Sequence, residues 1–191
     1  MASEKITLYI DPLQIKAQED NNYGLYLAKK VNGLFTVIWQ SRIPMAKVGT
    51  PSYEYKNDFD ITIPSYNVNY GNVTTVDGAI SFTSGGKNQP IEVGQTVELD
   101  ANGLFGTPRN DGTAGVITIK NQLAGNPHEI LSDEDGNVIF VNVASGMDIG
   151  KADLTPVDTY QLWFDNLQDT GTIIAHNVSN PGVVVFDGGT S

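Results

Sequence analysis

Two histidines, His128 and His176, are the side chains of this sequence best suited to proton transfer near neutral pH. Glu129 directly follows His128, and a histidine paired with a carboxylate can act as a general acid or base. The neighbouring residues complete no catalytic motif. Ile-Leu-Ser stands where a zinc protease has its second histidine, and no Gly-x-Ser-x-Gly element is present. The sequence therefore favours a protein without catalytic activity, with an atypical His/carboxylate enzyme as an alternative.

The chain contains no cysteine. Thiolate catalysis, disulfides and cysteine-bound zinc or iron–sulfur sites are thereby excluded. A metal centre made of histidines would have to use both of those present. We expect no cofactor.

An acidic segment, PHEILSDEDGN, follows Asn126. Within it, Asp133, Asp135 and Asn137 have the spacing with which an EF-hand loop begins, and oxygen ligands suit calcium. Val138 occupies the glycine position of such a loop, and the glutamate that ends it is missing. Asp135-Gly136 is also a typical hairpin turn. We favour the hairpin and keep calcium only as a weak alternative.

Aromatic rings beside amides and carboxylates provide the candidate binding surface. If Tyr160 and Leu162 face the core, strand alternation turns Trp163 outward beside Asp165. The segment that begins at Tyr23 has the same pattern and turns Tyr26 outward. An exposed ring can stack on a sugar while nearby polar groups form hydrogen bonds. The alternative is that a loop, a second layer or another subunit covers this face.

Five aromatic rings lie within PSYEYKNDFDITIPSYNVNYGN, residues 51–72. Period-two alternation over 58–63 and 66–70 predicts that Phe59, Tyr66 and Tyr70 face the core, which leaves the asparagines between them on the opposite face. Two further tyrosines follow a Gly-Thr-Pro turn and are predicted to be exposed. The candidate ligand-binding residues are Trp163, Tyr26, Asp165, Asn166, Asn67, Asn69, Tyr53 and Tyr55.

Turn signals are frequent, and they separate short segments rich in β-branched or alternating apolar residues. Asn-Gly or Asp-Gly pairs begin at positions 32, 77, 102, 111, 135 and 187. Strands are predicted at 6–10, 23–31, 34–40, 58–63, 66–70, 79–83, 95–99, 116–120, 138–143, 160–165, 172–176 and 182–186, with one helical turn at 12–19. About a dozen short strands predict an all-β antiparallel β-sandwich or, as the alternative, a barrel.

The segment from Tyr23, YGLYLAKKVNGLFTVIWQS, resembles YQLWFDNLQDTGTIIAHNV from Tyr160. Both read as an apolar strand, a polar turn and a second apolar strand. We expect a single domain over residues 1–191. Two related halves, about 1–100 and 101–191, are the alternative.

Acidic residues outnumber basic ones 22 to 11, which gives a net charge of −11. Such a surface repels nucleic acids and anionic membranes, so we expect neither as a partner. The start of the chain does not have the pattern of a secretory signal, and no apolar run reaches the ~20 residues of a membrane span, which predicts a cytoplasmic protein.

The preferred functional interpretation is a lectin-like binding protein that recognises a neutral glycan or a protein partner. A self-assembling or toxin-like protein is a third alternative. Exposed strand edges would then support a homodimer.

Overall fold

The computed structural model describes residues 4–43, 56–174, 178 and 181–186. This part of the chain is almost entirely β-structure, which confirms the predicted fold class. It holds one helix, α1 (Pro12–Asp20), which is longer than the single turn expected. The strands are β1 (Lys5–Tyr9), β2 (Tyr23–Val31), β3 (Gln40–Arg42), β4 (Lys56–Asp60), β5 (Tyr66–Val76), β6 (Ala79–Ser84), β7 (Gln89–Ile91), β8 (Thr96–Leu99), β9 (Ile117–Asn121), β10 (His128–Asp133), β11 (Val138–Val141), β12 (Gly150–Leu154), β13 (Pro156–Asn166) and β14 (Gly182–Val185).

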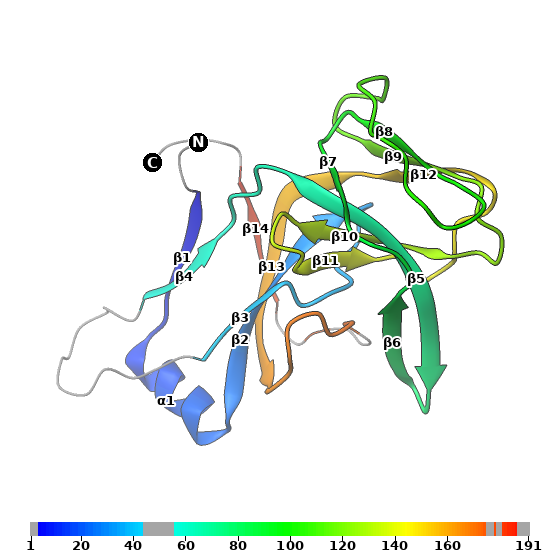
Figure 1. Cartoon of the computed structure of the whole chain (residues 1–191). Helices are drawn as coiled ribbons and strands as arrows, with labels where there is room; N and C mark the ends of the chain where they lie inside the picture. Colours follow the sequence, from blue (N-terminus) through cyan, green and yellow to red (C-terminus); the bar gives the residue numbers. More distant parts are fainter. Residues whose placement is uncertain (1–3, 44–55, 175–177, 179–180, 187–191) are drawn as a thin grey trace.

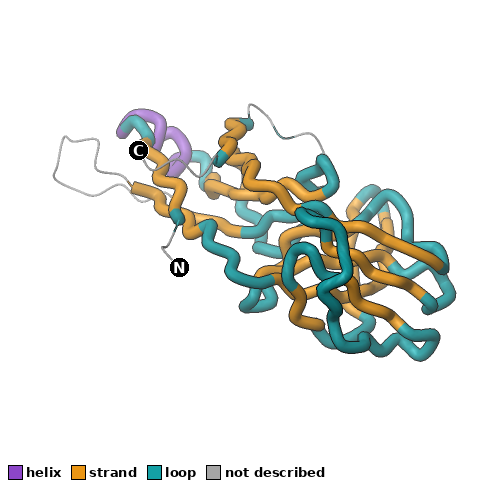
Figure 2. The backbone as a smooth tube through the Cα atoms, turned by 90° about the horizontal axis from the view of Figure 1, so that it is seen from above, coloured by secondary structure: helices purple, strands orange, loops and turns teal. Residues whose placement is uncertain are grey.

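The strands form several sheets around a shared interior. One sheet has the order β14-β13-β2-β3, and another has the order β11-β10-β5-β6 with β7 also paired to β5. Smaller sheets have the orders β12-β9-β8 and β1-β4. The long strands β5 and β13 are visibly curved (Figure 1), and α1 lies at one end of the molecule (Figure 2).

One pair of strands departs from the predicted antiparallel arrangement. β8 and β9 pair in parallel, with Thr96 opposite Thr118 and Leu99 opposite Asn121. A parallel pair needs a long crossover connection, because the chain must return to the same end of the sheet before it can pair again. Residues 100–116 supply that connection, and part of the candidate site lies on it.

Two of the predicted dipeptides form tight turns with positive φ at both residues, whereas Asp111-Gly112 has a positive φ at neither residue. Asn32 and Gly33 have φ angles of 51° and 80°, and Asp77 and Gly78 have 50° and 84°. Positive φ at both central residues defines the hairpin turn that these dipeptides favour. Gly136, with φ of 87°, lies in the turn that joins β10 to β11, so this hairpin is confirmed.

The main hydrophobic core draws residues from all the sheets. Phe59, Val68, Leu131, Ile119 and Leu162 are representative, with exposed fractions of 4% or less. Burial of such side chains typically stabilises a fold by about 1.5–3 kcal/mol each.

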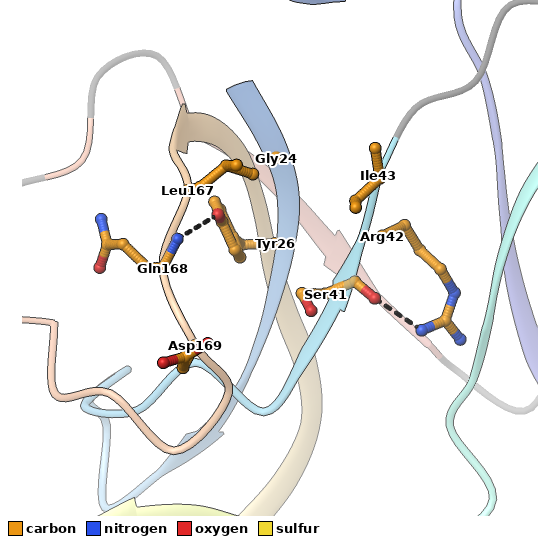
Figure 3. A pocket seen from close by; sticks show the side chains of 8 residues that line it. All are labelled: Gly24, Tyr26, Ser41, Arg42, Ile43, Leu167, Gln168 and Asp169. Carbon is orange, nitrogen blue, oxygen red and sulfur yellow. Dashed lines mark hydrogen bonds between the residues drawn. The ribbon is translucent and has the colours of Figure 1, made fainter. Parts of the chain in front are cut away.

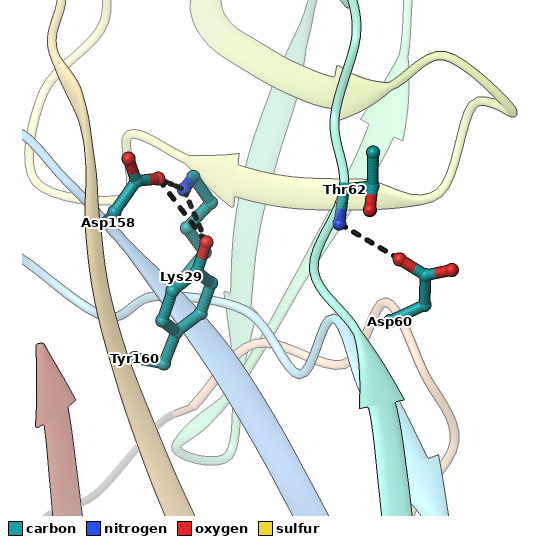
Figure 4. Close-up of polar contacts among 5 residues, drawn as sticks. All are labelled: Lys29, Asp60, Thr62, Asp158 and Tyr160. Atoms are coloured by element: carbon teal, nitrogen blue, oxygen red, sulfur yellow. Dashed lines mark hydrogen bonds and ion pairs between the residues drawn. The ribbon is translucent and has the colours of Figure 1, made fainter. Parts of the chain in front are cut away.

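A buried lysine lies at the edge of this core. Lys29 on β2 is 1% exposed, and its Nζ lies 2.8 Å from Asp158 Oδ1 and 3.0 Å from the Tyr160 hydroxyl, both on β13 (Figure 4). Burial lowers the pKa of Lys29, while the hydrogen bond and charge of Asp158 act in the opposite direction. The cluster ties β2 to β13 through side chains as well as backbone.

The predicted strand at 34–40 does not form, and the chain follows an irregular path there. After the Asn32-Gly33 turn, Val31 and Leu34 exchange both backbone hydrogen bonds, but the chain then leaves β2 and returns as β3. The predicted strand at 172–176 also does not form in its described part. Instead, Val37 forms an isolated bridge with Ile173. We call residues 35–39 and 171–174 the crossing segments.

The two similar sequence segments lie beside each other in the fold. Tyr26 and Trp163 occupy equivalent positions in the two segments, and they pair with each other across β2 and β13. The crossing segments that follow also bond to each other, from Ile38 N to Thr172 O at 3.0 Å and from Ile174 N to Thr36 O at 2.9 Å. The two segments therefore pair with each other, in addition to the pairing of β2 with β3.

Candidate functional site

The sequence predicted that Tyr26 and Trp163 are exposed, and this prediction is wrong. Their exposed fractions are only 1% and 3%. The rings do point away from the main core, as strand alternation requires, with centroids 5.7 Å apart. A second apolar cluster covers them, made of Ala28, Ile38, Phe35, Ile174 and Val178. The alternative in which a loop covers this face is therefore correct, and the crossing segments supply much of the cover.

The Tyr26 hydroxyl is also fully used within the chain. It donates to the carbonyl oxygen of Asn166 at 3.0 Å and accepts from the backbone N–H of Gln168 at 2.8 Å (Figure 3). Burial raises the pKa of Tyr26, and the bond from Gln168 partly offsets this. A cavity of about 350 Å³ borders the ring, with Ser41 and Arg42 on its far side. Tyr26 thus supports the 166–168 turn.

The Trp163 indole lacks such a partner. Its Nε1 is buried and forms no hydrogen bond with any residue that the structure describes. An unsatisfied buried donor costs about 1–3 kcal/mol. Packing of the ring in the second cluster must offset this cost.

The predicted polar ligands on β5 are buried and bonded within the protein. Asn67 and Asn69 are 7% and 3% exposed, against the prediction that their face is open. Asn67 Nδ2 donates to the Asp133 carbonyl at 2.7 Å. Asn69 Nδ2 donates to the Gly86 carbonyl at 3.0 Å and to Asn88 Oδ1 at 2.9 Å. Asn67 thus ties β5 to the end of β10, and Asn69 holds the β6–β7 loop in place.

The remaining binding candidates are dispersed. Asp165 is partly buried, and its Oδ1 accepts from the backbone N–H of the exposed Asn166 at 2.8 Å. Tyr53 and Tyr55 lie outside the described residues, as does His176. The predicted set therefore does not assemble into one site in the part that the structure describes.

His128 and Glu129 are consecutive on β10 and so point to opposite faces of the strand. His128 Nδ1 lies 2.6 Å from the Asn142 carbonyl, and Glu129 Oε1 accepts from Asn142 Nδ2 at 2.8 Å. Their hydrogen bonds thus end on Asn142 instead of on each other. Glu129 Oε2 is buried with no hydrogen bond to any described residue. The suggested acid–base pair is wrong in its geometry.

The calcium candidates lie in one polar cavity of about 510 Å³, which Asp133, Asp135 and Asn137 all line. Asp133 Oδ2 accepts from Trp39 Nε1 at 2.9 Å, and Asp133 Oδ1 accepts from Asn137 N at 2.8 Å. The Asn137 amide also donates to Asp133 Oδ2 at 2.9 Å. Among the described residues, no three acidic or histidine side chains are placed to share a metal ion. The segment is a hairpin turn whose carboxylate anchors Trp39.

A different cleft combines aromatic rings with amide side chains, the features that the sequence predicted around Tyr26 and Trp163. It holds about 700 Å³ between β5, the β6–β7 loop and the 100–116 connection. We call it the Tyr70 cleft. Its lining residues are Tyr70, Gly85, Gly86, Lys87, Asn88, Gln89, Asn102, Gly103, Leu104 and Phe105.

Two rings form the apolar wall of the Tyr70 cleft. The centroids of Tyr70 and Phe105 are 6.1 Å apart, with an interplanar angle of 56°. Tyr70 donates through its hydroxyl to the Gly103 carbonyl at 3.2 Å. A Cβ atom at Gly85 or Gly86 would lie 2.5 or 2.7 Å from carbons of the Tyr70 ring. Only glycine allows these loops to approach so closely.

Backbone and amide hydrogen bonds hold both loops of this cleft. Gly85 N donates to the Tyr70 carbonyl at 2.8 Å. The side chain of Asn69 donates to the carbonyl of the next loop residue, Gly86. On the other loop, Asp100 Oδ1 accepts from Leu104 N at 2.8 Å and from Asn102 N at 2.9 Å. The Leu104 N–H bond is the main reason that the pKa of Asp100 is lowered. The cleft is therefore largely formed before any ligand arrives.

The cleft also carries polar side chains that can form hydrogen bonds with a ligand. They are three amides and one ammonium group, that of Lys87, and none of the lining residues is acidic. This contrasts with a chain in which acidic residues outnumber basic ones 22 to 11.

Sequence reasoning missed this cleft, although two signals were present. Tyr70 was assigned to the core because period-two alternation already explained its ring. In the sequence, Gly85-Gly86 completes no binding motif, and Asn102-Gly103 indicates only a turn. Nothing in the sequence shows that loops so far apart meet at one tyrosine.

No helix among the described residues combines the length and apolar character needed to cross a bilayer. The chain matches no protein-family model, no curated protein and no solved structure at a significant level. The fold and the geometry of the cavities are therefore the grounds on which function is argued.

Proposed function

We propose that this protein is a non-enzymatic, lectin-like binding protein that takes up a neutral glycan in the Tyr70 cleft. The observation that carries the proposal is the meeting of the Tyr70–Phe105 ring pair with amide side chains and glycine backbone in one preformed cleft. Its volume of about 700 Å³ falls within the usual range for small-molecule sites.

The chemistry of a sugar matches these walls. A pyranose has an apolar face that packs on aromatic rings and hydroxyl groups that bond to amides. The close glycines leave the loop backbone accessible to a ligand. The Lys87 ammonium group at the cleft can donate a hydrogen bond to a sugar hydroxyl.

A glycan array followed by calorimetric titration tests the proposal. We expect the wild-type protein to bind one class of neutral glycan. Asn102→Ala should weaken this binding about 3- to 10-fold, because one net hydrogen bond is worth about 0.5–1.5 kcal/mol. Asn102 is exposed, so its loss should leave the fold intact.

Leu104→Glu provides a stronger test, because it places a carboxylate at the rim of the cleft. Leu104 is 66% exposed, and Ile149, which lies outside the cleft, is 70% exposed. Ile149→Glu is therefore the matched control. We expect Leu104→Glu to abolish glycan binding and Ile149→Glu to leave it unchanged. Absence of any glycan binding, or equal binding by both variants, would contradict the proposal.

A further inference from the structure

A second cavity, of about 560 Å³, lies between α1 and the sheet of β14, β13, β2 and β3. We call it the α1 pocket. Leu8 on β1, Gln18 on α1, Leu25 on β2 and Phe164 on β13 line it, together with Gly182 and Val184 at the edge strand. It shares no lining residue with the Tyr70 cleft.

The walls of the α1 pocket are mainly hydrocarbon. Leu25, Leu162 and Phe164 come from the face of the sheet that also builds the main core. None of the residues that line it is charged, although the chain has 33 charged residues, 22 acidic and 11 basic. A charged ligand would lose its hydration without a partner here, which is strongly unfavourable. The pocket therefore selects for an uncharged, largely apolar molecule.

One polar atom of a residue that lines this pocket lacks a partner. Gln18 lines the pocket, and its Oε1 is buried without a hydrogen bond to any described residue. A buried acceptor left in this state carries a free-energy cost that a donor would relieve. The terminal torsion of a glutamine is soft, so a small rotation turns this oxygen toward a ligand. A ligand with one hydroxyl or N–H group would supply the missing donor.

Gly182 keeps the pocket open at the edge strand. It pairs with Leu162, so a side chain at position 182 would share the face on which Leu162 lines the pocket. A Cβ atom there would approach only the Leu162 carbonyl oxygen, at 3.9 Å, which is an ordinary contact. The position thus accepts a larger side chain, and that side chain would occupy the pocket.

From these observations we propose that the α1 pocket binds a small, uncharged, apolar molecule that donates one hydrogen bond to Gln18, such as an aliphatic alcohol. This site is separate from the Tyr70 cleft and does not depend on glycan binding.

Titration of the full-length protein with octanol, followed by isothermal titration calorimetry, tests the inference. We expect octanol to bind saturably. Octyl methyl ether lacks the donor and should bind about tenfold more weakly. Octanoate should not bind. Absence of saturable octanol binding, or tighter binding of octanoate, would overturn the proposal.

Substitutions at two pocket positions, with one control, assign the octanol binding to this pocket. Gly182→Leu should abolish octanol binding by filling the cavity, while Val185→Leu, on the opposite face of β14 and 68% exposed, should leave it unchanged. Gln18→Leu should remove the preference for octanol over its methyl ether. Far-ultraviolet circular dichroism verifies that each variant is folded, and Gly182→Ala, with a smaller side chain, should weaken binding less than Gly182→Leu. Unchanged octanol binding by folded Gly182→Leu would refute the site.

Discussion

Whether a single side chain in this protein is exposed depends on what covers each face of its strand. Alternation correctly separated Tyr160 and Leu162 from Trp163, but it could not reveal that the second face is also covered. Asn67 and Asn69 show the same effect with polar side chains, since both are buried and bonded to backbone carbonyls. An outward position in a strand is therefore not the same as an exposed one.

At Trp163, the cost of substitution should depend on whether ring volume is kept. We expect Trp163→Ala to lower the free energy of unfolding by about 3–5 kcal/mol, as for other large buried aromatics. Trp163→Phe should cost clearly less, because it retains most of the packing and removes the unsatisfied Nε1 donor. Urea denaturation measures both values. Equal losses for the two variants would show that the indole nitrogen is satisfied in solution.

The tyrosines near Lys29 predict a dependence of stability on alkaline pH. Burial raises the pKa of Tyr66 and of Tyr160, and the negative charge of Asp158 adds to both shifts. The unfolded chain releases these protons near pH 10, before the folded protein does, so stability should fall as the pH rises above about 10. The lowered pKa of Lys29 has the opposite effect on stability. Its contribution to the free energy of unfolding grows as the pH rises toward about 10, because the unfolded chain keeps this proton longer than the folded protein.

Tyr160→Phe separates these effects. The variant loses the hydrogen bond between the Tyr160 hydroxyl and Lys29, so it should be less stable than the wild type at pH 7. Above about pH 10, its stability should fall less steeply, because one of the two tyrosines no longer titrates. Urea denaturation between pH 7 and pH 11 provides the measurement. Parallel stability curves for the two proteins would show that Tyr160 does not contribute.

The crossing segments are the elements that cover the second face of the sheet at β2 and β13. Their mutual bonds, such as Gly171 N to the Ile38 carbonyl at 2.8 Å, hold them over β2 and β13. Ile38 and Ile174 pack directly in the cluster that contains Trp163. Such irregular chain is hard to predict because neither period two nor period 3.6 describes it.

Removal of one side chain from a crossing segment should uncover Trp163. We expect Ile174→Ala to increase quenching of tryptophan fluorescence by acrylamide, since both tryptophans are nearly inaccessible in the wild-type protein, at 4% and 3% exposure. Val157→Ala, at a position that is 39% exposed, serves as the control and should not change the quenching. If both variants are quenched like the wild type, the crossing segments do not protect the ring.

Across the whole molecule, strand pairing joins the two halves of the chain. β2 pairs with β13, and β5 pairs with β10. Lys29 and Asp158, whose ion pair links the first of these, are separated by 129 positions in the sequence. Each half therefore lacks one neighbour of each of its central strands, which are β2 and β5 in the first half and β10 and β13 in the second.

Separate expression of residues 1–100 and 101–191 should therefore give two unfolded chains. The intact protein should unfold in one cooperative transition, followed by near- and far-ultraviolet circular dichroism in urea. A stable fold for either half, or two resolved transitions, would instead support the alternative of two independent units. Because the pairing is long-range, we also expect folding on a timescale of about milliseconds to seconds or slower.

The sequence by itself determined the all-β class, the tight glycine turns and the approximate position of most strands. It could do so because turn chemistry and period-two alternation are local properties of the backbone. Only the tertiary structure decided which rings are buried and which loops meet, as at Tyr70, where Gly85 and Gly103 converge from different parts of the chain. Such contacts depend on long-range packing, and no short window of sequence contains both partners.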